Sequence, residues 1–155
     1  MDKNIEYTQM AKYYDLFYAR KNYDKEVEFI RHFAKEGKCS ILDAGCGTGN
    51  HAKILKDCGF QVFGFDLSEE MIKIASEKLG NTFENGNILN YHSDKRYDIV
   101  ISFFAVFNHL KTYKEFEIAL KNLKGLLNES GVLIIDLHNP SKNGQKIDKF
   151  ENIVR

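Results

Sequence analysis

The sequence predicts an α/β fold, in which an open parallel sheet of about five strands has helices on both faces and a helical cap at the N-terminus. Three observations lead to this prediction. Short apolar runs alternate with amphipathic segments, which is the order of a parallel α/β sheet. A glycine-rich loop follows the first apolar run, at residues 45–49. The most apolar run, residues 97–103, fits a strand that is buried on both faces.

Five runs of apolar and β-branched residues are the predicted strands. They are residues 38–44, 60–65, 82–84, 97–103 and 132–136. Glycine and polar residues lie between these runs and the helices, because such residues end both kinds of element. A polar turn is predicted at residues 128–131, directly before the last strand.

Helices are predicted between the strands, at residues 50–58, 68–79 and 113–127. Each has apolar residues at intervals of three and four, which gives it one face that can pack on a sheet. Ser68, followed by Glu69 and Glu70, has the form of an N-cap with acidic residues in the first turn.

Two further helices are predicted before the first strand, at residues 7–17 and 23–35. We therefore divide the chain into three parts: an N-terminal helical cap (1–36), a core that binds the ligand (37–139) and a polar C-terminal segment (140–155).

The composition argues against several classes of protein. With 22 basic and 22 acidic side chains among 155 residues, the chain has no basic excess for binding a nucleic acid. The longest apolar stretch, residues 99–107, is too short to span a membrane, and no signal-peptide pattern opens the chain. Three cysteines without paired spacing fit reduced thiols and a cytoplasmic location. No cluster of histidines and cysteines predicts a metal site.

The strongest functional signal is the motif D-A-G-C-G-T-G at residues 43–49. A strand that runs into such a loop, with a helix behind it, presents backbone N–H groups to an anionic ligand. The spacing differs from the dinucleotide motif G-x-G-x-x-G, which would need a third glycine at Asn50. A second acid, Asp66, closes the next strand at the distance where a carboxylate binds ribose hydroxyls.

This motif, together with Asp66, resembles the first motif of the class I S-adenosylmethionine-dependent methyltransferases. The resemblance covers most of the chain and implies a Rossmann-like sheet with S-adenosylmethionine as cofactor. It implies that Gly45, Gly47 and Gly49 let the backbone approach the methionine half of the cofactor. Asp43 would then face the cofactor's ammonium group, and Asp66 would bind its ribose.

The resemblance also assigns residues around the adenine of the cofactor. Leu67 and Met71 would lie on its two faces, although a methionine at the start of a helix can equally fill the core. Asn87 stands where the family often has aspartate, and its amide oxygen can accept the hydrogen bond of the adenine amine. Ile88 would supply a backbone N–H and an apolar contact.

Three residues are open to two interpretations each. Cys46 is either a small residue beside the cofactor or a nucleophile, although no motif pairs it with a base. Phe103 lines the ligand pocket or belongs to the core. His109 is a general base or a residue that packs on the helix after it. The loop after Phe103 lacks the Asn/Asp-Pro-Pro-Tyr signature, which argues against nucleobases and amides as substrates.

The string Tyr13-Tyr14-Asp15-Leu16-Phe17-Tyr18 resembles the N-terminal lid of small-molecule methyltransferases, including amino-sugar N-methyltransferases. In that resemblance a tyrosine closes over the sulfonium, because its π face attracts a cation. Tyr14 or Tyr13 is the candidate, and the alternative is an amphipathic helix that anchors aromatic rings on the domain.

The family's sheet usually continues with a reversed hairpin, for which residues 137–155 leave no room. The fifth strand would then be an open edge, which predicts self-association with another chain through that edge. The predicted function is methyl transfer to a nitrogen or oxygen of a small-molecule acceptor. The alternatives are a module that binds the cofactor without catalysis, or a truncated fragment, and, third, an NAD-dependent oxidoreductase.

Overall fold

The structure is a computed structural model that describes residues 11, 13–34, 39–138 and 153–154. Residues 13–17 form a short helix that precedes the labelled elements. The elements that follow are α2 (Tyr23–Arg31), β1 (Ser40–Ala44), α3 (Asn50–Asp57), β2 (Gln61–Asp66), α4 (Glu69–Leu79), β3 (Phe83–Asn85), β4 (Tyr97–Ser102), the 3₁₀ helix η1 (Val106–His109), α5 (Tyr113–Gly125), β5 (Leu127–Ile135) and β6 (Ile153–Val154).

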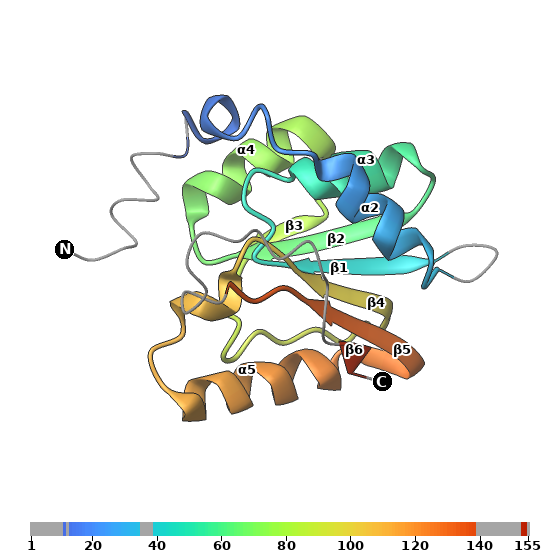
Figure 1. Ribbon diagram of the computed structural model, residues 1–155, viewed down its shortest axis with the longest axis vertical. Coiled ribbons are helices and arrows are strands. Elements are labelled where there is room, and N and C mark those ends of the chain that lie inside the picture. Colours follow the sequence, from blue (N-terminus) through green and yellow to red (C-terminus); the bar gives the residue numbers. More distant parts are fainter. Residues whose placement is uncertain (1–10, 12, 35–38, 139–152, 155) are drawn as a thin grey trace.

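The strands form one sheet in the order β3-β2-β1-β4-β5-β6 (Figure 1). Neighbours from β3 to β5 are parallel, and β6 runs antiparallel to β5. Asp43 on β1 pairs with Gly64 on β2 and with Ile101 on β4, so it lies in the middle of the sheet. Because parallel strands end at the same edge, Asp43 and Asp66 come close to each other at the carboxyl ends of β1 and β2.

Two hydrophobic clusters cover the two faces of the sheet, since successive side chains of a strand point to opposite sides. One cluster joins Ile41 and Ile99 to α2, α3 and α4. The other joins Leu42 and Val100 to α5 and to the segment before β4. Figure 1 shows α2, α3 and α4 on one side of the sheet and α5 on the other. The predicted parallel sheet with helices on both faces is therefore confirmed.

Helix ends follow the signals in the sequence. The Ser68 hydroxyl accepts a hydrogen bond from the Met71 N–H (3.4 Å) and caps α4. Gly49 precedes α3 with a left-handed backbone and has no side chain to cap the helix, so the first N–H groups of α3 stay open to a ligand.

The C-terminal half of the sheet departs from the prediction in two ways. The predicted turn at residues 128–131 is part of β5, which begins at Leu127, and the pairing shifts register between Tyr97↔Leu127 and Ile99↔Val132. The prediction that no strand follows β5 is also wrong, because Ile153 and Val154 pair antiparallel with Ile134 and Leu133. Two β-branched residues suit a short edge strand, and they satisfy part of the open edge of β5.

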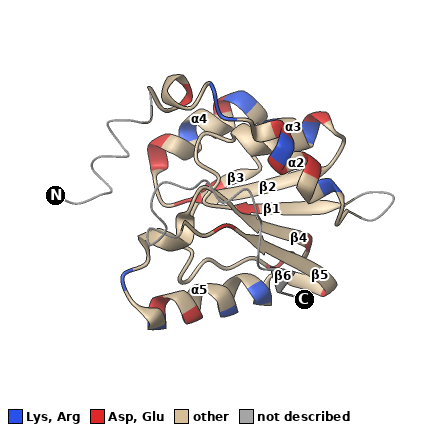
Figure 2. Ribbon diagram, viewed as in Figure 1, with Lys and Arg blue, Asp and Glu red and all other residues tan. Residues whose placement is uncertain are grey.

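The predicted division at residues 36/37 falls outside the described residues, as do most of residues 1–12 and 139–152. Val27 and Ile30 of α2 belong to the same buried cluster as Ile41 of β1, so α2 packs as part of the core. No helix among the described residues is long and apolar enough to cross a membrane. Figure 2 shows both signs of charge interspersed along α3, α4 and α5.

Candidate functional site

The glycine loop after β1 turns back on itself through left-handed backbone. Gly45, Gly47 and Gly49 have φ angles of 83°, 54° and 82°. The N–H groups of Gly45 and Cys46 both donate to the carbonyl of Phe65, at 2.8 and 3.0 Å, and so fix the loop to the end of β2. A Cβ on Gly45 would lie 2.5 Å from Val106 Cγ2, so this position has no room for a side chain.

Asp66 ties the loop to the start of α4. Its carboxylate accepts from the Gly47 N–H (2.9 Å) and from the Ser68 N–H (2.9 Å), one on each oxygen. Burial raises the pKa of Asp66, although these backbone donors lower it. A carboxylate oxygen can accept more than one hydrogen bond, so the contacts leave acceptor capacity for two hydroxyls.

Asp43 is buried beside the loop, with 1% of its surface exposed. Its Oδ2 has no hydrogen-bond partner among the described residues. Burial raises the pKa of Asp43 to about 6; the charges of His51 and Lys21 lower it, and that of Asp66 raises it. A buried carboxylate oxygen without a donor is rare in folded proteins and indicates a place for a donor from a ligand.

Cys46 is buried inside the loop, and its Sγ lies 3.7 Å from the Gly47 carbonyl. Burial, together with Asp43 and Asp66, raises the pKa of the Cys46 thiol well above its ordinary value. Because the thiolate is the nucleophilic form, this surrounding disfavours the nucleophile interpretation and fits a small residue in the loop.

Of the residues predicted around adenine, Leu67 and Met71 follow β2, and Asn87 and Ile88 follow β3. Leu67 is 53% exposed, whereas Met71 is buried with 2% exposed and contributes to packing. Asn87 Oδ1 already accepts from the Leu89 N–H (2.9 Å), which leaves it one further acceptor position. Ile88 is buried, and its carbonyl accepts from Asn122 Nδ2 (3.0 Å).

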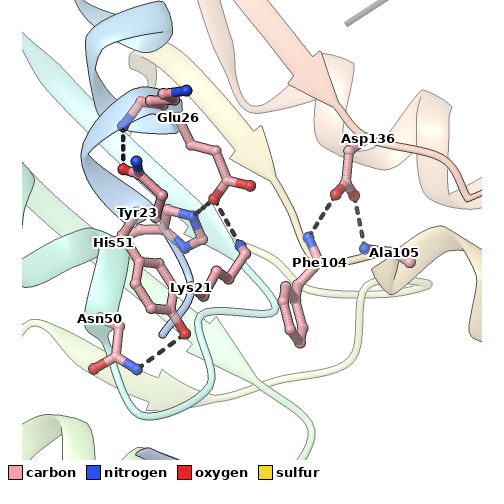
Figure 3. A network of polar contacts seen from close by, with 10 residues as sticks. Lys21, Tyr23, Glu26, Asn50, His51, Phe104, Ala105 and Asp136 are labelled. Atoms are coloured by element: carbon pink, nitrogen blue, oxygen red, sulfur yellow. Dashed lines mark hydrogen bonds and ion pairs between the residues drawn. The ribbon is translucent and has the colours of Figure 1, made fainter. Parts of the chain in front are cut away.

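The loop after β4 contains a structural feature that sequence reasoning missed. Phe104 and Ala105 have left-handed backbone, with φ of 71° and 57°. Their N–H groups donate to the carboxylate of Asp136, at 2.9 and 2.7 Å (Figure 3). Burial raises the pKa of Asp136, while these two N–H groups lower it. An available signal was the position of Asp136 at the end of β5, which matches those of Asp43 and Asp66 on their strands.

The structure separates the two tyrosine candidates. Tyr14 Cε1 lies 3.9 Å from where a Cβ on Gly47 would be, so its ring borders the glycine loop. The same ring is 4.7 Å from that of Tyr18 and 6.3 Å from that of Phe104. Tyr13 is 58% exposed. Of the two tyrosines, Tyr14 is therefore the better candidate for a contact with a ligand at the glycine loop.

A charged group from the cap, also missed, lies beside this aromatic cluster. Glu26 Oε2 contacts Lys21 Nζ (2.6 Å) and His51 Nε2 (2.5 Å), and Figure 3 shows its carboxylate between the two bases. Burial raises the pKa of Glu26, but the hydrogen bonds from His51 and Lys21 outweigh it and hold the pKa below the usual value. Lys21 Nζ lies 4.2 Å from the centre of the Phe104 ring. A histidine one position after the predicted helix start was the available signal.

The remaining candidates, Phe103 and His109, lie directly after β4 and at the end of η1. Phe103 is buried, and its ring centre is 5.5 Å from that of His51. His109 lies exposed at the end of η1. An open groove of about 760 Å³ exists elsewhere, between α5 and β5, where Ile118, Leu120 and Leu133 form its apolar part. It contains none of the acids or glycines described above, so we do not assign the ligand to it.

The described residues fit S-adenosylmethionine. An unpaired, buried carboxylate oxygen is available for an ammonium group, open N–H groups at the start of α3 suit a carboxylate, and Asp66 suits a diol. Of the three loop glycines, Gly47 leaves space beside the backbone: a Cβ there would have Tyr14 Cε1 as its nearest neighbour, at 3.9 Å.

Comparison with known proteins agrees with this geometry. Residues 41–131 match the family described as "Methyltransferase domain". The chain is 30% identical to dTDP-3-amino-3,4,6-trideoxy-alpha-D-glucopyranose N,N-dimethyltransferase of Streptomyces venezuelae over 134 residues, or 81% of this chain and 56% of the relative. It is 36% identical to glycine/sarcosine N-methyltransferase of Halorhodospira halochloris over 118 residues, or 72% and 44%.

Among solved structures, Streptomyces venezuelae DesVI superimposes with a TM-score of 0.72 at 31% identity, over 81% of this chain and 56% of that one. An S-adenosylmethionine-dependent methyltransferase from Clostridium acetobutylicum gives 0.71 at 28% identity, over 84% and 57%. The chain spans between 50% and 60% of the length of the first three curated relatives it matches. The oxidoreductase alternative loses its support, because the chain belongs to the methyltransferase domain family and shares the fold of S-adenosylmethionine-dependent methyltransferases.

Proposed function

We propose that the protein transfers a methyl group from S-adenosylmethionine to an amine of a small molecule. An oxygen acceptor is the second candidate. The two relatives described above are named for N-methylation of an amino sugar and of glycine or sarcosine, which favours nitrogen.

One observation carries the proposal: the unpaired, buried oxygen of Asp43 beside a loop of three glycines with left-handed backbone. A protein that kept this carboxylate for stability alone would pair it, because an unpaired buried carboxylate is destabilising. A cationic group of a ligand would supply the missing hydrogen-bond donor and offset this destabilisation.

The chain's own residues would bind and orient the reactants. Asp43 would receive the ammonium group of the cofactor, and Asp66 would accept from its ribose hydroxyls. Leu67, Met71, Asn87 and Ile88 would surround its adenine. When bound, S-adenosylmethionine supplies an electrophilic methyl on a sulfonium, so alignment and exclusion of water are the protein's main tasks.

Three further residues have proposed roles near the methyl group that is transferred. The π face of the Tyr14 ring would attract the positive charge of the cofactor's sulfonium, an interaction of up to about 2 kcal/mol when desolvated. Phe103 would form an apolar wall. His109 is the proposed general base, and an amine that is already neutral would need none.

Calorimetry of the chain with S-adenosylhomocysteine and, separately, with NADH tests the proposal. We expect binding of the first only. Asp66→Ala should abolish it, because a charge-assisted contact to two hydroxyls is lost. Asp57→Ala is the control, since Asp57 pairs with Lys53 (2.9 Å) at the exposed end of α3. The apo melting temperature of each variant separates loss of binding from loss of folding, because Asp66 also holds Gly47 and Ser68.

Methyl transfer is then measured with radiolabelled S-adenosylmethionine and a panel of amino sugars and amino acids. No binding of S-adenosylhomocysteine would refute the proposal. Binding without transfer to any acceptor would support the alternative, a module that binds the cofactor without catalysis.

The location of the protein and the self-association of the chain are two further proposals. We propose a cytoplasmic location, which the free thiols of Cys39, Cys46 and Cys58 support. We also propose that copies of the chain associate through the edge beyond β5, where β6 pairs with only Leu133 and Ile134. Sizing chromatography that gave a monomer would contradict the second.

A further inference from the structure

The carboxylate of Asp15 forms the first of two contacts between the N-terminal segment and the region of the glycine loop. Its Oδ1 accepts from Thr48 Oγ1 (2.5 Å) and from Asn50 Nδ2 (3.0 Å), and its Oδ2 pairs with Lys78 Nζ. Thr48 and Asn50 lie on either side of Gly49, and Lys78 belongs to α4. One side chain of the cap thus holds both the loop and the helix that follows Asp66.

Several features indicate that these contacts are specific. Lys78 also donates to the Thr48 carbonyl (3.4 Å), so the loop, α4 and Asp15 form one network. Thr48, which donates to Asp15, is 1% exposed, whereas the Asp15 side chain is 42% exposed. Burial raises the pKa of Asp15, but the hydrogen bonds from Lys78, Thr48 and Asn50 hold it below its ordinary value.

Asp15 is the neighbour of Tyr14, whose ring borders Gly47. The second attachment of the same segment is Glu26, which contacts His51 directly after Asn50. Tyr23 lies between the two attachments, and its hydroxyl accepts from Asn50 Nδ2 (3.3 Å). The segment therefore covers the loop along its length, from Gly47 to His51.

We propose that Asp15 is a positioning residue of the cofactor site: it holds Tyr14 against the glycine loop, and its contacts with Thr48, Asn50 and Lys78 must break before the cofactor can exchange. This inference rests on the proposed function. It predicts that loss of Asp15 opens the segment in the free protein and speeds release of the bound ligand, with little change in how the remaining site contacts that ligand.

Trypsin cleavage within residues 20–31 of the free chain, followed by mass spectrometry, measures opening without any ligand. We expect Asp15→Ala to raise this cleavage rate about tenfold, because the loss of charge-assisted hydrogen bonds should shift the equilibrium towards the open segment by about a factor of ten. Lys78→Met removes the ion pair with Asp15 and the hydrogen bond to the Thr48 carbonyl but keeps the Asp15 contacts with Thr48 and Asn50, so it should give a smaller increase. Asp57→Ala, which breaks the exposed pair with Lys53, should leave the rate unchanged.

Dissociation of radiolabelled S-adenosylhomocysteine gives the second measurement. Asp15→Ala should speed dissociation about tenfold, and Tyr14→Ala should do the same. In the double variant the effects should not add, since Asp15 acts through Tyr14. Additive effects would mean that Asp15 only stabilises the fold, and would overturn the inference.

The two measurements distinguish the possible failures. If the unaltered chain does not bind S-adenosylhomocysteine, the proposed function fails, and the trypsin measurement still judges whether Asp15 holds the segment. If the ligand binds and both Asp15→Ala and Lys78→Met keep the rates of the unaltered chain, the inference is wrong. Lys78→Met decides the question by itself if Asp15→Ala does not fold.

Discussion

Two neighbouring strands, β1 and β4, end in left-handed turns that are held in different ways. After β1, the turn consists of glycines at 45, 47 and 49, which adopt positive φ without a steric penalty. After β4, Phe104 and Ala105 adopt the same kind of backbone, which costs an L-residue roughly 1–2 kcal/mol. The second turn needs the carboxylate of Asp136 to accept from both its N–H groups.

The acids beside the two turns differ accordingly. Both oxygens of Asp136 accept hydrogen bonds from the β4 turn, whereas Asp43 Oδ2 has no partner among the described residues beside the glycine turn. The glycine turn takes its acceptors from β2: Gly45 and Cys46 donate to the Phe65 carbonyl, and Gly47 donates to Asp66. Asp43, the acid of β1 itself, therefore keeps one oxygen for a ligand, whereas the β4 turn uses both oxygens of Asp136. The four predictions below test this difference, in order of decreasing effect.

The largest effect is expected where the glycine turn is closed to side chains. Gly45→Ala should lower the free energy of unfolding by about 3–4 kcal/mol, because the new methyl meets Val106 Cγ2 and the backbone is left-handed. Gly59→Ala is the matched control: its φ is 90° but nothing lies within 4 Å, so only the backbone cost of about 1 kcal/mol applies. Urea unfolding of both variants measures the difference, and equal losses would show that Val106 gives way.

The second prediction concerns the unpaired acid. Below about pH 3 the Asp43 carboxyl is protonated in both the folded and the unfolded chain, so it contributes nothing to the pH dependence. Between about pH 4 and 6 the carboxyl ionises in the unfolded chain but stays protonated in the folded chain, so the free energy of unfolding falls as the pH rises. Above about pH 6 the fall is complete and amounts to about 3 kcal/mol, which corresponds to a pKa raised from 3.8 to about 6. Asp43→Asn should therefore stabilise the ligand-free protein at pH 7 by about 2 kcal/mol and weaken its binding of S-adenosylhomocysteine.

Unfolding in urea at pH 4, 5, 6 and 7 measures this effect as the difference between Asp43→Asn and the unaltered chain. Asp15 and Glu26 have lowered pKa values, so their stabilisation is lost as the pH falls, but they are present in both proteins and cancel. A difference that stayed constant from pH 4 to 7 would show that Asp43 is not penalised by burial.

The same contrast explains what the sequence could predict. The parallel sheet followed from apolar runs such as 97–103, and the glycine turn from a local motif, since glycine marks left-handed backbone by itself. Asp43 was chosen because it belongs to that motif, and Asp66 because it closes the next strand at the spacing of a βαβ unit. These signals lie within one strand–helix–strand unit of the chain.

The missed features depend on contacts between distant residues. Phe104 and Ala105 give no sign of positive φ, because the carboxylate that holds them is 32 and 31 residues away. Glu26 and His51 are 25 residues apart, so their pairing required the packing of α2 on α3. Strand β6 was missed because two residues are too few to show a period, and its partner, β5, decides its register.

The third prediction removes the acid that holds the β4 turn. Asp136→Ala should lower the free energy of unfolding by about 2 kcal/mol, because two N–H groups lose a charged acceptor, and the relief of a buried carboxylate offsets part of that loss. Asp136→Asn keeps one acceptor oxygen and should cost about 1 kcal/mol. The urea midpoints measure both, and an unchanged midpoint in Asp136→Ala would mean that Phe104 and Ala105 hold their backbone without help.

The smallest effect, and the most direct test of the comparison, comes from making the β4 turn resemble the β1 turn. Ala105→Gly removes the left-handed penalty of roughly 1–2 kcal/mol, but the unfolded chain gains entropy worth roughly 0.4–1 kcal/mol. By itself the change should stabilise the protein by about 0.5 kcal/mol, measured from the urea midpoint. In the Asp136→Ala background it should recover about 1 kcal/mol, since the strained turn has then lost its acceptor. Equal effects in the two backgrounds would mean that Asp136 holds the loop for a reason other than its left-handed backbone.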